Sequence, residues 1–554
     1  MLAGQSTATS ELVDENVSWF KIWVWATVAI YLINLWLDVR QLKQFYLSKV
    51  PASIEKHVTQ EQFDKCQKYS LAKQQFKIMK DYFTTAFKVL LWTMAWPAMF
   101  WEYTAAWSAS KADPAVKPMV YDFYQALLLM GFFIVLGMAI NYPFDMISKF
   151  LIEEQHGFNK QSFGGWVKDH VLALIIQVVL MPPVIYVILW IIAKTGDNFV
   201  LYLGVAITFI YLIFMVLIPI VIMPMFNKYD QIEENNLKKD IQAVASEVEY
   251  PLSKVEVIDG SKRSGHSNAF QYGFGKIKKV VIFDTLLDQH LGLTEEAKER
   301  DAAEQKEAEA GEEGKEAPAE KKQRAQSDFN YDNYEGRVEI LSIVAHELGH
   351  WGNNDVMKMS VYNLVYMYIV FFIFKFVLQY TDMTDDFGFA SNTSVFIKLY
   401  LFIMLLAPVN FFEDLVSNFM VRQIEYNADR YSVDLGYGLA LQDALIKVHV
   451  NNSANLVPDW IFSIFRFNHP PLVERLNAID AAMCQLTETT AAEEAKQAYA
   501  EKFTDTLAQR HNHSDAIQGD QMEGGACEEA GEVAVQKDRA LQYGKFQLRE
   551  ALLK

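Results

Sequence analysis

Long apolar segments separated by polar, lysine-bearing segments dominate the pattern of this chain. Each apolar segment has roughly the twenty residues that an α-helix needs to cross the hydrocarbon core of a bilayer. A buried helix of a soluble protein can also be this apolar, but a whole series of such segments predicts a mainly α, polytopic membrane protein with about seven transmembrane helices. The candidate segments are 17–39, 83–103, 121–143, 170–193, 200–224, 357–380 and 395–416. Lys88, Lys375 and Lys398 interrupt three of them, and a charge inside a membrane must face a polar interior or reach the membrane surface.

Lysines are distributed unevenly over the connecting segments. Residues 40–82, 148–169 and 227–345 carry many of them, whereas 194–198 is very short and 381–394 has neither Lys nor Arg. Because lysine-rich loops stay on the cytosolic side, the N-terminus is expected to be lumenal and the C-terminus cytosolic. Seven spans are consistent with this orientation.

Between the fifth and sixth apolar segments lies a polar region. It contains one amphipathic helical pattern, at 237–249, and three short strand patterns at 254–258, 268–274 and 279–283, which predict a small β-unit. Residues 294–328, rich in Glu, Lys and Ala, are expected to form a disordered or loosely helical acidic insertion. The predicted domains are 17–224 (membrane helices 1–5), 225–355 (polar region with the β-unit), 356–417 (membrane helices 6–7), 418–485 (C-terminal helices) and 486–554 (polar tail).

The overall composition argues against several classes of protein. With 51% hydrophobic residues and a net charge of −18, the chain is not expected to bind nucleic acid. The three cysteines, an odd number without a C-x-x-C pair, predict neither a disulfide framework nor a thiolate zinc site. Residues 1–16 lack the basic start of a signal peptide, so cleavage there is not expected.

The most specific chemical pattern is His-Glu-Leu-Gly-His at 346–350. On a helix, His346 and His350 project from the same face one turn apart, and this spacing suits two nitrogen ligands of one tetrahedral Zn²⁺. Glu347 is placed to act on a water molecule at the metal rather than to bind the metal. Apolar residues fill most of 340–345, as a buried ligand helix requires.

A catalytic zinc ion usually has three protein ligands, and two histidines with one glutamate form a common set. The extended pattern that would supply a third histidine fails, because Asn353 and Val356 stand where Gly and His should be. Glu425 is the predicted third ligand, on a helix that the last two membrane segments can return to the first. Asp429 shares its helix face and is placed to hold a ligand histidine in one tautomer. One Zn²⁺ per chain is therefore expected.

At this point the chain resembles the CAAX prenyl proteases of the integral membrane zinc metalloprotease type, the family of the yeast a-factor-converting enzyme. The resemblance covers about residues 17–485 and is specific, because five separated motifs occur in order. They are IEEQHGFN at 152–159, GSKRSGHSNA at 260–269, HELGH at 346–350, EYNAD at 425–429 and NHPPLVERL at 468–476.

The resemblance implies seven membrane helices that enclose a chamber, with a gluzincin-like zinc site near its cytosolic side. It implies residence in the endoplasmic reticulum membrane and removal of the last three residues of isoprenylated proteins ending in C-a-a-X. Some members of the family cut a second time upstream. The partners implied are prenylated C-a-a-X proteins and the lipid bilayer, and the oligomeric state is left open.

The resemblance also implies roles for individual residues. His346, His350 and Glu425 resemble the zinc ligands, and Glu347 resembles the general base. Asp429 resembles a carboxylate that supports a ligand or donates a proton, and His469 resembles a residue close to the oxyanion of the reaction. Arg475 is expected to hold Asp429 by a paired hydrogen bond.

The β-unit suggests how a peptide is held. An extended peptide can add to a free strand edge through main-chain hydrogen bonds, which would place its carbonyl over zinc. Residues 266–269 resemble the edge-strand motif of the family, so His266 and Asn268 are candidate peptide contacts. A plain turn is the alternative for His266.

Two other functions remain as alternatives. In a site-2-type intramembrane metalloprotease the third ligand is an aspartate in an L-D-G context inside a membrane span, and only Asp434-Leu435-Gly436 approaches it here. A non-enzymatic membrane protein with a structural zinc would not need Glu347, which is present.

Overall fold

A computed structural model describes residues 18–110, 118–310, 324–378, 382–389 and 394–488 of the 554-residue chain. Within these residues, five helices are long and apolar enough to cross a membrane. They are α1 (Trp19–Gln44), α4 (Pro118–Ile147) with its continuation η1 (Ser148–Glu153), α5 (Phe163–Thr195), α6 (Phe199–Leu217) with its continuations η3 (Ile218–Ile222) and α7 (Met223–Phe226), and α12 (Asp355–Val377). The prediction of a mainly helical, polytopic membrane protein is confirmed.

A sixth span exists only if two bent helices count as one. α14 (Val395–Leu405) and α15 (Ala407–Asp434) meet at Leu406 with a bend of 55°. Pro408 lies in the first turn of α15, where its ring and missing N–H prevent α14 from continuing straight. The segment predicted at 395–416 is therefore not one straight helix.

The segment predicted at 83–103 is also not one helix. α2 (Gln60–Thr93) ends there, and α3 (Trp96–Ser110) begins after a break at Ala95. Ala95 has a φ of 52°, a left-handed conformation that no α-helix contains, and Pro97 follows it in the first turn of α3. Seven continuous spans are thus not found among the described residues, where five or six satisfy length and composition.

A four-stranded sheet forms the β-unit. Its order is β1 (Tyr229–Gln231), β2 (Leu252–Ile258), β4 (Ile277–Phe283) and β3 (Ala269–Phe274). Only β2 and β4 pair in parallel; β1 and β3 are antiparallel edge strands. β2, β3 and β4 match the predicted strands, whereas the three-residue β1 is too short to leave a sequence pattern.

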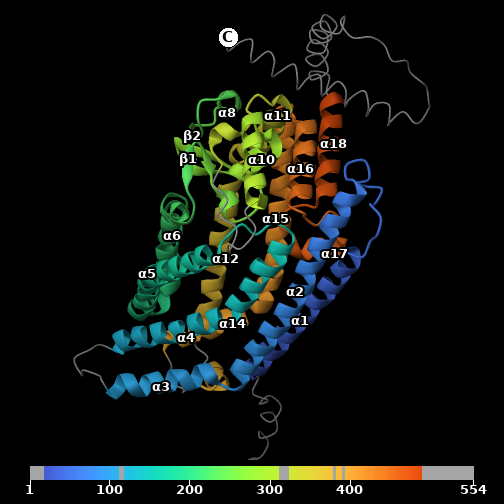
Figure 1. The fold of residues 1–554 in the computed structure, drawn as a ribbon. Coiled ribbons are helices and arrows are strands. Elements are labelled where there is room, and N and C mark those ends of the chain that lie inside the picture. Colours follow the sequence, from blue (N-terminus) through green and yellow to red (C-terminus); the bar gives the residue numbers. More distant parts are fainter. Residues whose placement is uncertain (1–17, 111–117, 311–323, 379–381, 390–393, 489–554) are drawn as a thin grey trace, which may run out of the picture.

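The sheet shares one apolar core with three helices: α8 (Asn236–Glu247), α9 (Asp284–Leu291) and α11 (Tyr334–Gly352). α8 is the amphipathic helix predicted at 237–249. Shorter elements complete the described chain: η2 (Gly196–Asn198), η4 (Gly260–Lys262), η5 (Gln326–Asp328), α13 (Asp382–Asp386), α16 (Gly438–Asn451), α17 (Trp460–Arg466) and α18 (Leu472–Glu488). In Figure 1 the sheet, α8, α11, α16 and α18 gather at one end of the molecule, and α3 and α4 lie at the other.

The first part of the acidic insertion is helical. It forms α10 (Glu295–Ala310), which is the helical one of the two alternatives expected for this segment. Glu and Ala favour a helix, and ion pairs of Arg300 with Asp328 (2.8 Å) and of Arg324 with Asp301 (3.0 Å) tie the two ends of the insertion together. Residues 311–323, and most of the polar tail from 489 onward, lie outside the described residues.

Candidate metal centre

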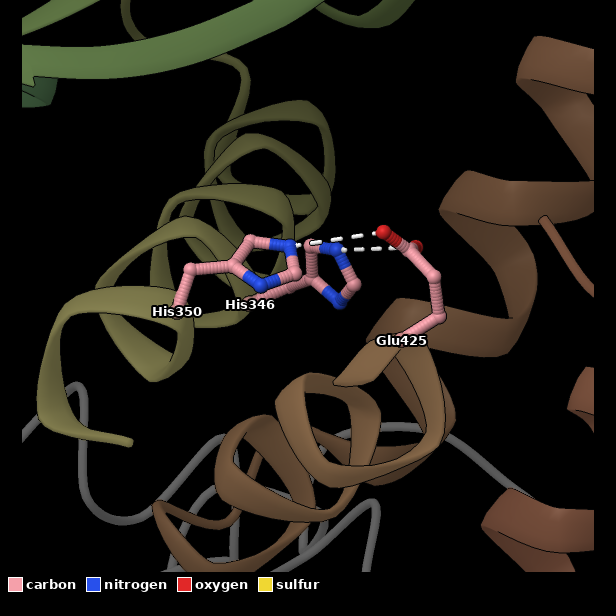
Figure 2. A group of neighbouring side chains, drawn as sticks. All are labelled: His346, His350 and Glu425. Carbon is pink, nitrogen blue, oxygen red and sulfur yellow. Dashed lines mark ion pairs between the residues drawn. The ribbon is translucent and has the colours of Figure 1, made fainter. Parts of the chain in front are cut away.

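The structure brings the three predicted ligands together (Figure 2). His346 and His350 lie one turn apart on α11, and Glu425 faces them from α15. Each histidine Nε2 lies 3.6 Å from a different oxygen of the Glu425 carboxylate. The three potential ligand atoms all lie within 4.8 Å of one another. Two helices from distant parts of the chain therefore form one cluster of donor atoms.

The close approach of these two helices depends on a glycine. A Cβ atom at Gly349 would lie 2.9 Å from the Cβ of Tyr431 and 3.1 Å from the Cα of Ala428, which is closer than such atoms pack. Two turns earlier on α11, the backbone oxygen of Ser342 accepts a hydrogen bond from the Ser432 hydroxyl at 3.0 Å. The α11–α15 contact thus requires small residues between the ligand side chains.

The other ring nitrogen of His346 meets the predicted carboxylate. Its Nδ1 lies 2.9 Å from Oδ1 of Asp429, which is only 1% exposed. Arg475, on α18, donates to both oxygens of Asp429, from Nε at 2.8 Å and from one terminal nitrogen at 2.5 Å. This bidentate pair balances a buried negative charge and fixes its orientation. The predicted arrangement of Asp429 and Arg475 is the one the structure contains.

Sequence reasoning missed the corresponding partner of His350. Its Nδ1 lies 3.2 Å from Oδ2 of Asp355, the first residue of α12 and only 3% exposed. On a continuous helix, a residue five positions after His350 would point away from it, so Asp355 could not reach the ring. A left-handed residue, Asn354 (φ 57°), turns the chain between α11 and α12 and brings the carboxylate back. Lys358 lies 3.2 Å from the other oxygen of Asp355.

The donor set fits a zinc ion. A carboxylate accepts from each Nδ1–H, so the lone pair of each ring is on Nε2, and both Nε2 atoms face the Glu425 carboxylate. Two neutral imidazoles and one carboxylate match a common catalytic zinc site with one position left for water or substrate. In a site without a cation, a buried Glu425 would lack a sufficient counter-charge, since Arg475 is 3.9 Å away.

Glu347 lies between the ligand helix and the edge strand β3. Burial raises the pKa of its carboxyl above the ordinary value, while positive charge on His346 and His350 acts in the opposite direction. The backbone N–H of Gln271, in β3, is near enough to act weakly on this carboxyl and to lower its pKa. The general base predicted from sequence therefore faces the strand on which a peptide was predicted to lie.

The free edge of β3 can be identified from its pairing with β4. Phe283 N–H donates to the backbone oxygen of Asn268 at 3.1 Å, and bonded residues alternate along an antiparallel strand. Every second residue, Gln271 among them, thus turns its backbone groups away from β4. The exposed side chain of Asn268 accepts from the N–H of Ala269 at 2.9 Å.

The side chain of His266 contacts residues that lie outside β3. Its ring stacks on Phe158 with centroids 4.4 Å apart, its Nδ1 lies 2.7 Å from Ser264 Oγ, and its Nε2 lies 3.5 Å from Tyr69 Oη. These contacts join the polar region to α2 and to the turn after η1. Peptide binding by His266 and Asn268 remains a prediction.

His469 reaches the cluster from the loop between α17 and α18. Its Nε2 lies 3.4 Å from Oε1 of Glu425, and its Nδ1 lies 2.9 Å from Oδ1 of Asn468. With 59% of its side chain exposed, the ring borders the open side of the site rather than its interior. This position beside the predicted ligand is compatible with the oxyanion role expected of it.

Comparisons with known proteins cover most of the chain. Residues 41–228 match the family model described as CAAX prenyl protease N-terminal, five membrane helices, and residues 231–483 match the model for peptidase family M48. The CAAX prenyl protease 1 homolog of Taenia solium is 30% identical over 487 residues, which are 83% of this chain and 95% of the relative. The homolog of Arabidopsis thaliana is 29% identical over 458 residues, 82% and 95% of the two chains.

A solved structure agrees in fold as well. The crystal structure of S. mikatae Ste24p superposes with a TM-score of 0.70 and 27% sequence identity, covering 84% of this chain and 99% of the other. The membrane helices and the region that carries the ligand cluster thus both fall within the parts of the chain that match these relatives. The chain belongs to peptidase family M48 and, within it, to the CAAX prenyl protease 1 family.

Proposed function

We propose that this chain is a zinc-dependent endopeptidase that removes the last three residues of isoprenylated proteins ending in C-a-a-X. One observation carries the proposal: two histidines and a glutamate from distant helices converge in a membrane chain of the CAAX prenyl protease 1 family. The names of its relatives supply the substrate class. A second, upstream cut follows only from the family resemblance and is part of the proposal as an additional activity.

Each site residue has a separate role in peptide hydrolysis. His346, His350 and Glu425 would hold zinc, and a zinc ion there would supply an acidic water and a positive charge for the scissile carbonyl oxygen. Glu347 takes the proton from the attacking water and delivers it to the leaving amine. The substrate adds to the free edge of β3, where backbone groups hold it extended. His469 donates a hydrogen bond to the oxygen that becomes negative in the transition state.

The site-2-type alternative is not supported. Its nearest candidate ligand, Asp434, lies at the end of α15 and pairs with Arg430, one turn earlier, at 2.9 Å. This pair is exposed, and Asp434 is not in the ligand cluster. A structural zinc without catalysis is disfavoured because Glu347, next to a ligand histidine on α11, faces the edge strand β3 near Gln271.

The proposed location is the endoplasmic reticulum membrane, with the N-terminus lumenal and the metal site cytosolic. The distribution of lysines over the loops supports this orientation. Protease protection of tags at the two ends, in sealed microsomes, tests it directly. A C-terminal tag protected inside the vesicles would contradict the orientation.

The function is tested by measuring metal content and cleavage together. Purified wild-type protein is expected to contain about one zinc per chain and to release the terminal tripeptide from a farnesylated C-a-a-X peptide. Glu425→Ala is expected to lose both zinc and cleavage, and a chelator to abolish cleavage in the wild type. Zinc-loaded protein that fails to cut prenylated peptides would overturn the proposal.

A further inference from the structure

A cavity with several charged side chains in its walls lies beside the membrane helix α1 and the helix α2, apart from the ligand cluster. It has a volume of about 440 Å³, is partly open, and is also lined by Ala407 of α15 and by Arg466, the last residue of α17. Its walls carry both acidic and basic side chains, although α1 is an apolar span. Charged groups in such surroundings are costly unless they are paired or serve a ligand.

The two acidic side chains of the cavity, Asp38 and Asp81, both pair with the same lysine. Lys77 lies 2.8 Å from Asp38 and 2.8 Å from Asp81, so one cation bridges both carboxylates. Arg466 and Lys88 also line the cavity, and neither forms an ion pair with any part of the chain that the structure describes. Three cations, Lys77, Lys88 and Arg466, thus face two carboxylates, which leaves the cavity with a formal excess of one positive charge.

Several polar atoms around the cavity lack partners. The buried Nε of Arg466 has no hydrogen-bond acceptor within the described residues. Oγ1 of Thr27 and Oδ1 of Asn34, which belong to two other lining residues, are likewise buried and unbonded there. Lys88 lies over the ring of Trp23 at 5.5 Å, and no carboxylate of the described residues forms an ion pair with it. Such a concentration of unsatisfied groups indicates a polar occupant, and the positive excess favours an anion.

The distance from the metal centre to Arg466 follows from the helix that carries Glu425. Asn418 Nδ2 donates to the backbone oxygen of Phe465, the neighbour of Arg466, at 3.1 Å. Asn418 precedes Glu425 by seven residues of α15, which corresponds to about 10 Å of helix. The loop after Arg466 then returns to the cluster at His469. Arg466 thus lies about one tripeptide length from the ligands, because three extended residues span at most about 10 Å.

We propose that Arg466 binds the free α-carboxylate at the C-terminus of the substrate, while Lys88 adds positive potential from deeper in the cavity. This inference rests on the proposed function and deepens it. A guanidinium offers parallel N–H donors that match a carboxylate, and its unbonded Nε is one of them. Binding the chain end at a fixed distance from the metal sets the cut three residues from that end.

The test compares two farnesylated C-a-a-X peptides that differ only in a C-terminal carboxylate or carboxamide. The wild type is expected to prefer the free acid by about tenfold or more in kcat/KM, as a desolvated charge-assisted hydrogen bond predicts. Arg466→Gln is expected to lose most of this preference through slower cleavage of the acid, with the amide unaffected. Arg466→Lys should keep part of it, and Lys88→Gln should reduce it. Lys254→Gln, at an exposed lysine of β2, is the matched control and should keep it in full.

The outcomes separate this inference from the proposed function. Equal cleavage of acid and amide by the wild type, or full preference in Arg466→Gln, would overturn the carboxylate site while leaving the protease assignment intact. Absence of cleavage of both peptides by zinc-loaded wild type would overturn the protease assignment and this inference with it. The zinc content and melting temperature of each variant are measured in parallel. If Arg466→Gln fails to fold, the carboxylate preference of Arg466→Lys and Lys88→Gln still tests the inference.

Discussion

Asp355 holds the second histidine of the metal centre from the first residue of a membrane helix. Its Oδ2 lies 3.2 Å from His350 Nδ1, much as Oδ1 of Asp429 lies 2.9 Å from His346 Nδ1. Each carboxylate also has a cation, Lys358 in one case and Arg475 in the other. The two ligand histidines are therefore supported by similar pairs, although the first pair is weaker because Lys358 is half exposed.

Asp355→Ala is expected to weaken zinc binding by about 10- to 100-fold, because His350 loses the acceptor that fixes its tautomer and ring orientation. Competition with a chelator of known affinity measures this without reference to activity. Asp434→Ala, which removes an aspartate from an exposed pair with Arg430, serves as the control and should retain zinc like the wild type. Equal zinc affinity of Asp355→Ala and wild type would show that the hydrogen bond has no role in metal binding.

Glu347→Gln is expected to keep about one zinc per chain and to lower kcat by several orders of magnitude. The side chain is next to a ligand but outside the ligand cluster, so its amide leaves the donor atoms unchanged while removing the proton acceptor. Zinc analysis and peptide cleavage on the same sample check both halves. Turnover close to the wild-type rate would exclude Glu347 as the base.

Gly349→Ala is expected to destabilise the protein by about 1–3 kcal/mol and to weaken metal binding, since the added methyl group forces α11 and α15 apart. Thermal unfolding in detergent, with and without chelator, measures both effects. Gly164→Ala is the control, because nothing lies within 4 Å of a Cβ at that helical position. If Gly349→Ala unfolds at the wild-type temperature and keeps its zinc, the close helix contact is not required.

Acid should destabilise the fold through His290, whose side chain is fully buried on α9. Burial lowers the pKa of His290 below its ordinary value, despite the opposing effect of Glu339 at 2.6 Å. For Glu339, burial acts to raise the pKa, but hydrogen bonds from His290 and Lys447 outweigh it and the pKa is lowered. The unfolded chain then binds more protons than the folded one, so stability is lost as pH falls.

The loss through His290 begins as pH drops below about 6.5, and the loss through Glu339 follows below about 4.5. Unfolding temperatures of chelator-treated protein between pH 7.5 and 5 report the first step. His290→Gln should flatten this dependence, since glutamine does not titrate. An unchanged pH slope in that variant would refute the assignment to His290.

The parts of the site that could be predicted from sequence depend on helical periodicity. His346 with His350, and Glu425 with Asp429, share helix faces by spacing alone, and the structure places both pairs as that spacing requires. Asp355 could not be found in this way, because a left-handed Asn354 interrupts the helix. The cavity at Arg466 depends on contacts between four separate helices, which no local pattern records.

The fold, like the site, could be predicted from the sequence only where a local pattern records it. Apolar length identified the membrane segments, and alternation identified three strands, but hydropathy is insensitive to a single backbone break. Ala95 and Leu406 each interrupt an apolar segment that remains apolar on both sides of the break. Pro97 and Pro408 stand just after these breaks and are their only local signals.

The wide separation of the site's residues along the chain also affects biosynthesis. Asp429 follows His346 by 83 residues and Arg475 follows it by 129. At the usual speed of translation, the ribosome needs on the order of ten seconds to synthesise the intervening chain. Throughout that interval the nascent chain holds His346 without Asp429 and Arg475, so the complete metal centre can form only after the C-terminal helices have been synthesised and have folded back onto α11.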